Sequence, residues 1–231
     1  MFVPLYDSNP TRFVRAPVVT WSIILACVAM HLFVGSALVL GPDVAQAAIL
    51  TLGLIPAVFN NVVDLPPQLR ILPETLGPLT YMWLHADWMH LLGNMLFLWV
   101  FGDNVEDAMG HLRFLLFYLI CGIAAGLAYA LLGPQASQAP LIGASGAVSG
   151  VVAAYLVLYP RVRVWILLFW RLPLPLSALW CLGGWVLFQF WQLFFASAES
   201  QVAWLAHIGG LAVGAVLVIL LKRREVPLFG G

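Results

Sequence analysis

The sequence predicts an all-α, polytopic membrane protein with six transmembrane helices. Apolar residues make up 63% of its 231 residues, charged residues make up only 9%, and the mean hydropathy is +0.99. This balance is far from that of a soluble globular domain and is typical of a membrane protein. The formal net charge is zero, so neither nucleic acid nor an acidic partner is indicated.

Six apolar segments account for most of the chain. The first, 18–40, has no Asp, Glu, Lys or Arg and is long enough to cross a bilayer core of about 30 Å. The other five are expected at 80–101, 114–132, 144–159, 176–196 and 202–221. They define a membrane domain over 18–221, between an N-terminal tail, 1–17, and a C-terminal tail, 222–231.

Two further segments are apolar but too short or too interrupted to span. Residues 41–79 contain many prolines and scattered charges, yet "AAILTLGLIPAVF" is too apolar for a solvated loop, so a half-sunk interfacial loop is expected. The run "VWILLFW", 164–170, is expected to dip into the membrane without crossing it. No cleavable signal peptide is expected, because the first apolar run is too long and has no small-residue cleavage pattern.

The Lys and Arg residues predict the orientation. With six spans, nine of the ten fall on the side of the two termini, and Arg70 alone falls on the other side. Because positive residues concentrate in cytoplasmic loops, both termini are expected in the cytoplasm. The chain is therefore predicted to be a multi-pass integral protein of the lipid bilayer.

Polar residues on three spans lie at compatible depths. Ser145 and His207 each lie 14 residues from the cytoplasmic edge of their span, which is about 21 Å along an untilted helix. On the second span, His90 lies about 17–24 Å and Asn94 about 11–18 Å above that edge. Their i, i+4 spacing places His90 and Asn94 on one helix face.

Each of these residues also has a purely structural interpretation. A serine in a span can bond back to a carbonyl one turn earlier, an asparagine can join two helices, and a neighbouring helix can satisfy a histidine. The pairs Gly146 with Gly150 and Gly210 with Gly214 permit close approach of the fourth and sixth spans. If these faces meet, Ser145 and His207 come to one crossing, although ordinary packing explains the glycines equally well.

Three motifs carry a resemblance to a known family. They are "HADWMHLLGN" (85–94), "GASGAVSG" (143–150) and "AHIGGLAVG" (206–214), and together they resemble the rhomboid intramembrane serine proteases. The stretch "GDNVEDAMGHLRF" after the second span is similar to bacterial members. The resemblance implies a rhomboid-like six-helix bundle with Ser145 as nucleophile and His207 as general base. It also implies an oxyanion hole made by the side chains of His90 and Asn94 and the backbone N–H of Ser145.

One position departs from this pattern. Some members carry an aromatic residue four places after the nucleophile, packed on the base, where this chain has Ser149. No aromatic support for His207 is therefore expected. A Ser-His dyad without a carboxylate is expected too, because Asp87 lies near the outer end of the second span and Glu199 lies in a loop.

The remaining polar residues have simpler interpretations. His85 is a candidate supporting residue near the outer end of the site, and His31 is expected to pack in the core. Glu106 and Gly110 are expected to hold the inner end of the second span, whereas Asp103 and Asp107 are expected to be solvated. The sequence has three cysteines, all within apolar runs and without ligand spacing, so no disulfide, metal or other cofactor is expected.

The predicted function is hydrolysis of peptide bonds in or near the transmembrane segment of single-span membrane proteins, in a bacterial inner membrane. The alternative is a non-catalytic relative that binds transmembrane helices as a membrane chaperone. Such a relative is expected to lack Ser145 or His207, and both are present. A small transporter would show inverted repeats, which the sequence lacks. The natural substrate and the oligomeric state stay open.

Overall fold

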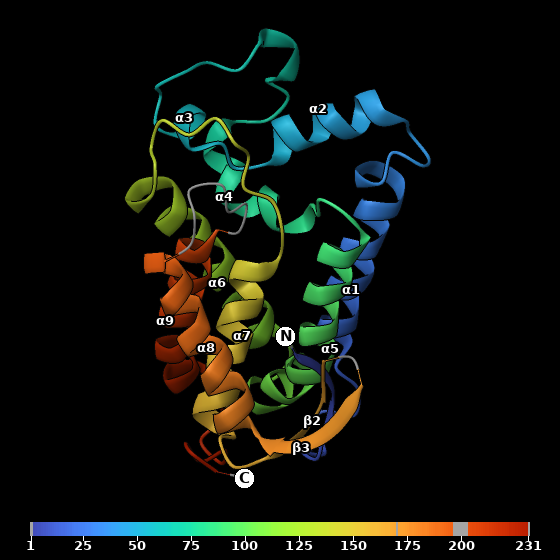
Figure 1. Ribbon diagram of the computed structural model, residues 1–231, viewed down its shortest axis with the longest axis vertical. Coiled ribbons are helices and arrows are strands. Elements are labelled where there is room, and N and C mark those ends of the chain that lie inside the picture. Colours follow the sequence, from blue (N-terminus) through green and yellow to red (C-terminus); the bar gives the residue numbers. More distant parts are fainter. Residues whose placement is uncertain (1, 170, 196–202, 231) are drawn as a thin grey trace.

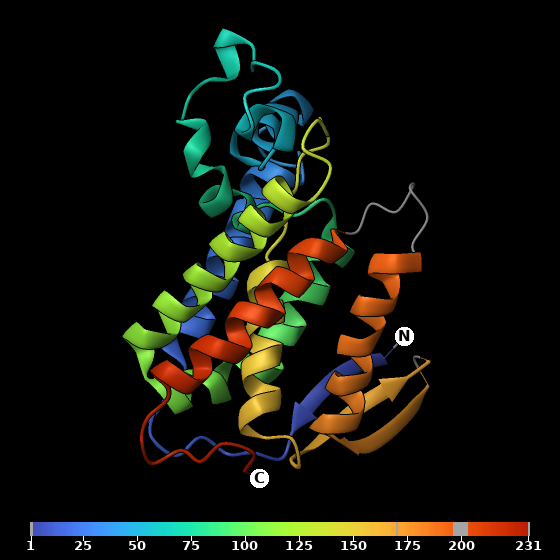
Figure 2. The ribbon, with the colours of Figure 1, turned by 90° about the vertical axis from the view of Figure 1, so that its left-hand side faces the viewer.

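A computed structural model of the chain describes residues 2–169, 171–195 and 203–230. Helices dominate it, and the long ones run roughly along one axis (Figures 1 and 2). These long helices are α1 (Val18–Met30), α5 (Trp88–Met109), α6 (His111–Leu132), α7 (Ser145–Leu158), α8 (Ala178–Phe195) and α9 (Trp204–Leu221). A π-helical turn, His31–Gly35, extends α1.

The lengths and composition of these helices fit a membrane bundle. Within the described residues, four helical segments are long and apolar enough to cross a membrane: Val18–Gly35, α6, α8 and α9. Helix α7 is apolar but has only 14 residues. The prediction of a mostly helical, polytopic membrane protein is confirmed. The expected ends of the fifth and sixth spans, at 196 and 202, lie outside the described residues.

Helix α5 is shifted by eight residues at each end from the second span expected at 80–101. Helix α5 starts at Trp88 because Asp87 caps it, accepting a hydrogen bond from the His90 backbone N–H at 2.8 Å. The preceding residues form the short helix α4 (Gly77–Thr80) and a 3₁₀ turn, Tyr81–Trp83. Helix α5 ends at Met109, and Gly110 follows it with a φ of +85° that favours glycine.

The segment 41–79 contains regular structure that the sequence analysis did not predict. It forms α2 (Pro42–Leu52), α3 (Pro56–Phe59) and 3₁₀ turns at Pro67–Leu69 and Glu74–Leu76, and it runs into α4. These elements lie together at one end of the long helices (Figure 1). The expected irregular loop is therefore a helical cap on the bundle.

A three-stranded antiparallel sheet lies at the opposite end, near both termini (Figures 1 and 2). Its strands are β1 (Phe2–Asp7), β2 (Arg163–Leu168) and β3 (Leu172–Ser177), in the order β1-β2-β3. This small sheet accompanies the mostly helical fold, and residues 164–168 of the run expected to dip into the membrane lie in β2. Trp170, at the end of that run, lies outside the described residues. The Tyr155 hydroxyl donates a hydrogen bond to Asp7, which joins the sheet to α7.

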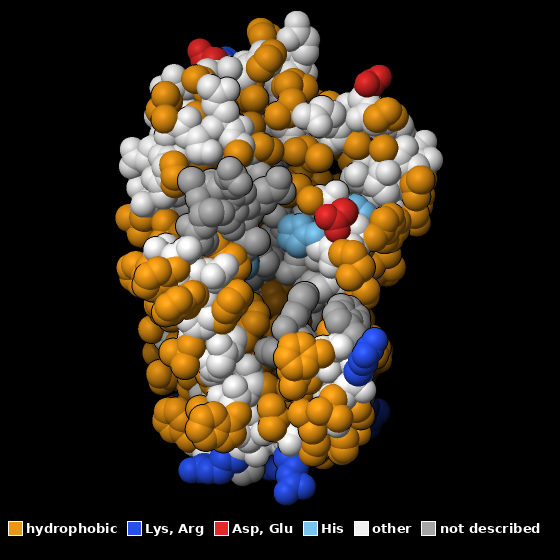
Figure 3. Space-filling model, viewed as in Figure 1, with side chains coloured by type: hydrophobic (Ala, Val, Ile, Leu, Met, Phe, Trp, Pro, Cys, Tyr) orange, Lys and Arg blue, Asp and Glu red, His pale blue; other side chains and the backbone are white. Residues whose placement is uncertain are grey.

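Charged side chains are unevenly distributed along the bundle. On the face in Figure 3, hydrophobic side chains cover the sides of the molecule, whereas most Lys and Arg side chains gather at the end that carries the sheet. This distribution is typical of a membrane protein whose sides face lipid.

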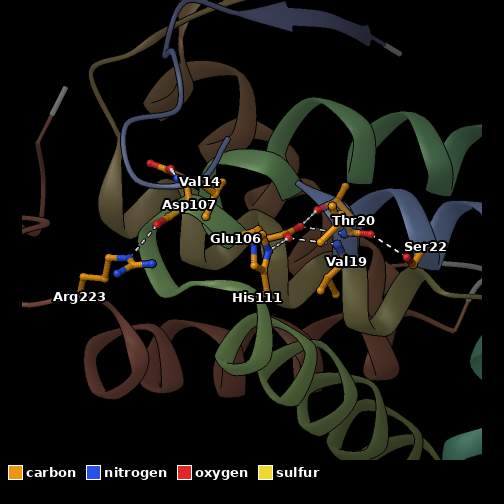
Figure 4. Close-up of polar contacts among 9 residues, drawn as sticks. Val14, Val19, Thr20, Ser22, Glu106, Asp107, His111 and Arg223 are labelled. Carbon is orange, nitrogen blue, oxygen red and sulfur yellow. Dashed lines mark hydrogen bonds and ion pairs between the residues drawn. The ribbon is translucent and has the colours of Figure 1, made fainter. Parts of the chain in front are cut away.

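Two acidic residues near the end of α5 hold the N-terminal part of the chain (Figure 4). The fully buried Glu106 carboxylate accepts hydrogen bonds from the backbone N–H groups of Val19 and Thr20, at 3.0 and 2.8 Å, and from the Thr20 hydroxyl at 2.7 Å. It also contacts His111 Nδ1 at 2.5 Å. Glu106 thus caps the first turn of α1, whose own N-cap residue is a proline without a side-chain acceptor.

The expectation that Asp107 is solvated is wrong. Its side chain is 4% exposed and accepts hydrogen bonds from the backbone N–H groups of Arg12, Phe13 and Val14 at 3.0, 2.6 and 2.7 Å. The neighbouring Asp103 is partly buried and accepts a bond from the Asn104 backbone N–H. The expected structural role of Glu106 therefore extends to Asp107.

We predict that Glu106→Ala lowers the thermal unfolding temperature strongly. The substitution leaves two backbone donors and a hydroxyl without an acceptor, and each buried unsatisfied group costs about 1–3 kcal/mol. Thermal unfolding in detergent measures the effect. The exposed Glu225 provides a matched control as Glu225→Ala, which should unfold like the wild type. An unchanged unfolding temperature for Glu106→Ala would show that this carboxylate does not hold α1.

Candidate active site

The site depends on the close contact of α7 with α9. A Cβ atom on Gly210 would lie 1.9 Å from the carbonyl oxygen of Gly146, and one on Gly214 would lie 2.4 Å from the carbonyl oxygen of Gly150. Real Cβ atoms do not approach backbone oxygens this closely, so both positions of α9 require glycine. The two glycine pairs noted in the sequence therefore meet at one crossing.

The glycines of α7 serve a second contact as well. A Cβ atom on Gly146 would lie 2.5 Å from Ala125 Cβ, and one on Gly150 would lie 2.6 Å from Cys121 Sγ. Ala125 and Cys121 belong to α6, so α7 is held between α6 and α9. Close packing against α6 and α9 therefore holds α7 on two sides, independently of any polar contact.

Ser145 and His207 meet at this crossing. The distance from Ser145 Oγ to His207 Nε2 is 2.8 Å, although the two residues are 62 positions apart in the chain. Ser145 is the first residue of α7 and is half-buried, whereas His207 lies in the first turn of α9 and is buried. The shared depth predicted from the sequence thus corresponds to a direct hydrogen bond.

Three residues around His207 were not predicted as parts of the site. Gln189 of α8 places its Oε1 atom 2.7 Å from His207 Nδ1, and its side chain is 2% exposed. The Trp185 ring stacks on the imidazole with centroids 6.3 Å apart, and the Trp204 ring meets it edge-on at 5.8 Å. His207 therefore has aromatic neighbours, contrary to the expectation drawn from Ser149. The Ser149 hydroxyl instead donates to the Ser145 carbonyl at 2.7 Å.

His90 lies against the segment that leads into α7. A Cβ atom on Gly143 would lie 2.7 Å from the Cε1 and Nε2 atoms of His90, and Gly143 has a φ of +122°. Gly143 is therefore needed both for its backbone conformation and for space. The Ala86 backbone N–H points to His90 Nδ1 at 3.4 Å, a long hydrogen bond that favours the proton on Nε2.

Asn94 and His85 lie close to His90. The Asn94 side chain is 7% exposed and donates to the His90 carbonyl at 3.1 Å. His85 is 1% exposed, and its ring lies 5.2 Å from that of His90 in an edge-on arrangement. The described hydrogen bonds of His90 and Asn94 stay within 86–94, so neither side chain bonds to Ser145. His31 is buried and packs edge-on against Trp88, as expected for a core residue.

The surroundings of the site are largely neutral. Asp87 lies just outside α5, and the hydrogen bond from the His90 backbone N–H keeps the pKa of its carboxyl below the usual value. Among the described residues, the hydrogen bonds of the His207 ring go to Ser145 and Gln189 and to no carboxylate. No group of three or more His, Cys, Asp or Glu side chains in the described chain could hold a metal ion. Figure 3 shows histidine side chains beside a hollow on this face.

Comparison with known proteins identifies the family. The model of the rhomboid domain matches residues 73–224, which include α4 to α9 and every residue described around Ser145. The chain belongs to the rhomboid family. This match confirms the family resemblance that the three sequence motifs indicated.

Individual rhomboid relatives come from plant, yeast and bacterial species. The chain is 34% identical over 155 residues to rhomboid-like protein 11, chloroplastic, of Arabidopsis thaliana, which covers 62% of this chain and 51% of that protein. It is 31% identical to rhomboid protein 1, mitochondrial, of Saccharomyces cerevisiae, over 57% of this chain and 38% of that protein. It is 32% identical to the rhomboid protease GluP of Bacillus subtilis, over 66% and 27% respectively. The match thus spans about half of these relatives or less.

Proposed function

We propose that this rhomboid is an intramembrane serine endopeptidase with a Ser145–His207 dyad. One observation carries the proposal: a serine hydroxyl and a histidine ring nitrogen lie 2.8 Å apart at the start of a buried helix. A serine hydroxyl is a weak nucleophile until a base removes its proton, and a neutral histidine suits that role near pH 7. His207 accepts the proton as Ser145 attacks the peptide carbonyl, and it then returns the proton to the leaving amine.

The oxyanion formed in this attack needs hydrogen-bond donors. We assign that role to His90 Nε2–H, the Asn94 side-chain amide and the Ser145 backbone N–H, which is free of intrahelical partners at a helix start. The contact of the His90 ring with Gly143, two residues before Ser145, supports this assignment. His85 packs behind His90 and would support its position.

The length of α7 supports access of water to the dyad. Its 14 residues extend about 21 Å, which is shorter than a bilayer core of about 30 Å. The outer end of α7 therefore lies below the outer edge of the bilayer core. Ser145 at that end is only half-buried. A peptide bond must leave its helix before a nucleophile can reach its carbonyl, so the proposed substrates are single-span membrane proteins cut near the outer edge of the span.

The proposed location is a bacterial inner membrane with both termini in the cytoplasm. The Lys and Arg side chains at the end that carries the sheet support this orientation (Figure 3). The similarity of residues 102–114 to bacterial members and the Bacillus subtilis relative support a bacterial membrane. The chloroplastic and mitochondrial relatives support a location in one of those organelles equally well.

We predict that a fluorophosphonate probe labels Ser145 in detergent and that both Ser145→Ala and His207→Ala abolish labelling. Labelling requires an activated hydroxyl, and the His207 variant keeps the serine but removes its base. Mass spectrometry of the adduct measures the outcome. His111→Ala, a histidine change at the far end of α6, should leave labelling intact. An adduct elsewhere, or one that survives in the His207 variant, would favour the helix-binding chaperone.

We further predict that His90→Ala and Asn94→Ala each lower kcat about 10²- to 10³-fold, because the charge that they stabilise exists only in the transition state. Cleavage of a single-span substrate in proteoliposomes measures kcat and KM separately. The neighbouring Met89 is 61% exposed, and Met89→Ala is the matched control with wild-type kinetics. A change in KM alone would exclude both residues from the oxyanion hole.

A further inference from the structure

Helix α8 supplies a polar contact to the base that the dyad does not explain. Gln189 is the middle of a chain of hydrogen bonds: its Nε2 atom donates to the Trp185 carbonyl at 3.3 Å, and its Oε1 atom lies 2.7 Å from His207 Nδ1. The side chain is 2% exposed. A buried amide in an apolar, membrane-facing helix is costly, so its orientation is expected to serve a purpose.

The Trp185 carbonyl determines which way the amide points. If the amide were turned over, two oxygen atoms would face each other at Trp185 and the NH₂ group would face the imidazole. With Oε1 toward the ring, Nδ1 must carry the proton, because an amide oxygen can only accept. The other nitrogen, Nε2, then has a free lone pair directed at the Ser145 hydroxyl, 2.8 Å away.

We propose that Gln189 is a positioning residue that holds His207 in the Nδ1–H tautomer required of the base. This inference rests on the proposed serine protease function. The neighbouring rings of Trp185 and Trp204 restrict the plane of the imidazole, but an indole offers no acceptor for Nδ1–H. Gln189 thus does through a neutral amide what a carboxylate does in a triad, and the hydrogen bond strengthens as the imidazolium forms.

A purely structural role of Gln189 predicts a different result. In that case the amide only satisfies a buried ring nitrogen, and its loss would lower stability without changing the tautomer or the reactivity of Ser145. The two roles are separated by measuring the tautomer of His207 and the labelling rate of Ser145 beside the unfolding temperature.

The experiment compares Gln189→Leu, which removes the acceptor, with Gln189→Glu, which keeps an acceptor oxygen whether or not it is protonated. The fluorophosphonate labelling rate of Ser145 should fall about tenfold or more in Gln189→Leu and be largely restored in Gln189→Glu. Nitrogen-15 NMR of labelled histidine should show His207 protonated on Nδ1 in the wild type and in Gln189→Glu, but not uniformly in Gln189→Leu. Gln192→Leu makes the same change on the same helix at a half-buried position and should label like the wild type.

Two results would overturn the inference. One is a wild-type protein with His207 protonated on Nε2, which decides the matter even if Gln189→Leu fails to fold. The other is a folded Gln189→Leu that labels at the wild-type rate with an unchanged tautomer. In both cases labelling of the wild type would leave the proposed function standing, whereas an unlabelled wild type would remove the proposed function itself.

Discussion

The contact between the backbones of α7 and α9 is the constraint on which the rest of the site depends. Helices that cross this closely need glycine at the crossing, and here the carbonyl oxygens of Gly146 and Gly150 lie where side chains of Gly210 and Gly214 would be. Ser145 directly precedes Gly146 of α7, and His207 lies three residues before Gly210 of α9. A wider crossing would carry the Ser145 hydroxyl out of hydrogen-bond reach of the His207 ring.

The two ends of the bundle support this crossing in different ways. At the end that carries the sheet, Glu106 and Asp107 bind backbone N–H groups of the N-terminal segment and hold α1 against α5. At the other end, Leu54 pairs with Leu141, and the Gly143 N–H donates to the Tyr81 carbonyl, so the entry to α7 is fixed. Ser145 therefore follows a short segment whose backbone is hydrogen-bonded at Leu141 and at Gly143.

The sequence was sufficient to predict those features that depend on local residue spacing and on charge. Apolar run lengths predicted the helices, and residue counts from the positive clusters placed Ser145 and His207 at one depth, where the structure joins them by a hydrogen bond. The sheet was missed because β1 pairs with β2 across more than 150 residues, and the prolines of β3 obscure its strand pattern. Asp107 was missed because its partners are backbone groups, which leave no sign in the sequence. Gln189 was missed because only the fold brings its amide to His207.

The most direct test of the close contact between α7 and α9 is the addition of one methyl group to α9. The rate at which a fluorophosphonate labels Ser145 should fall about tenfold or more in Gly210→Ala, because the new Cβ overlaps the Gly146 carbonyl and overpacking of this kind costs about 1–3 kcal/mol or more. Gly184→Ala on α8, where nothing lies within 4 Å of the added atom, should label like the wild type. A Gly210→Ala protein with the wild-type labelling rate and unfolding temperature would contradict the account, because Ser145 and His207 would then meet without the close crossing.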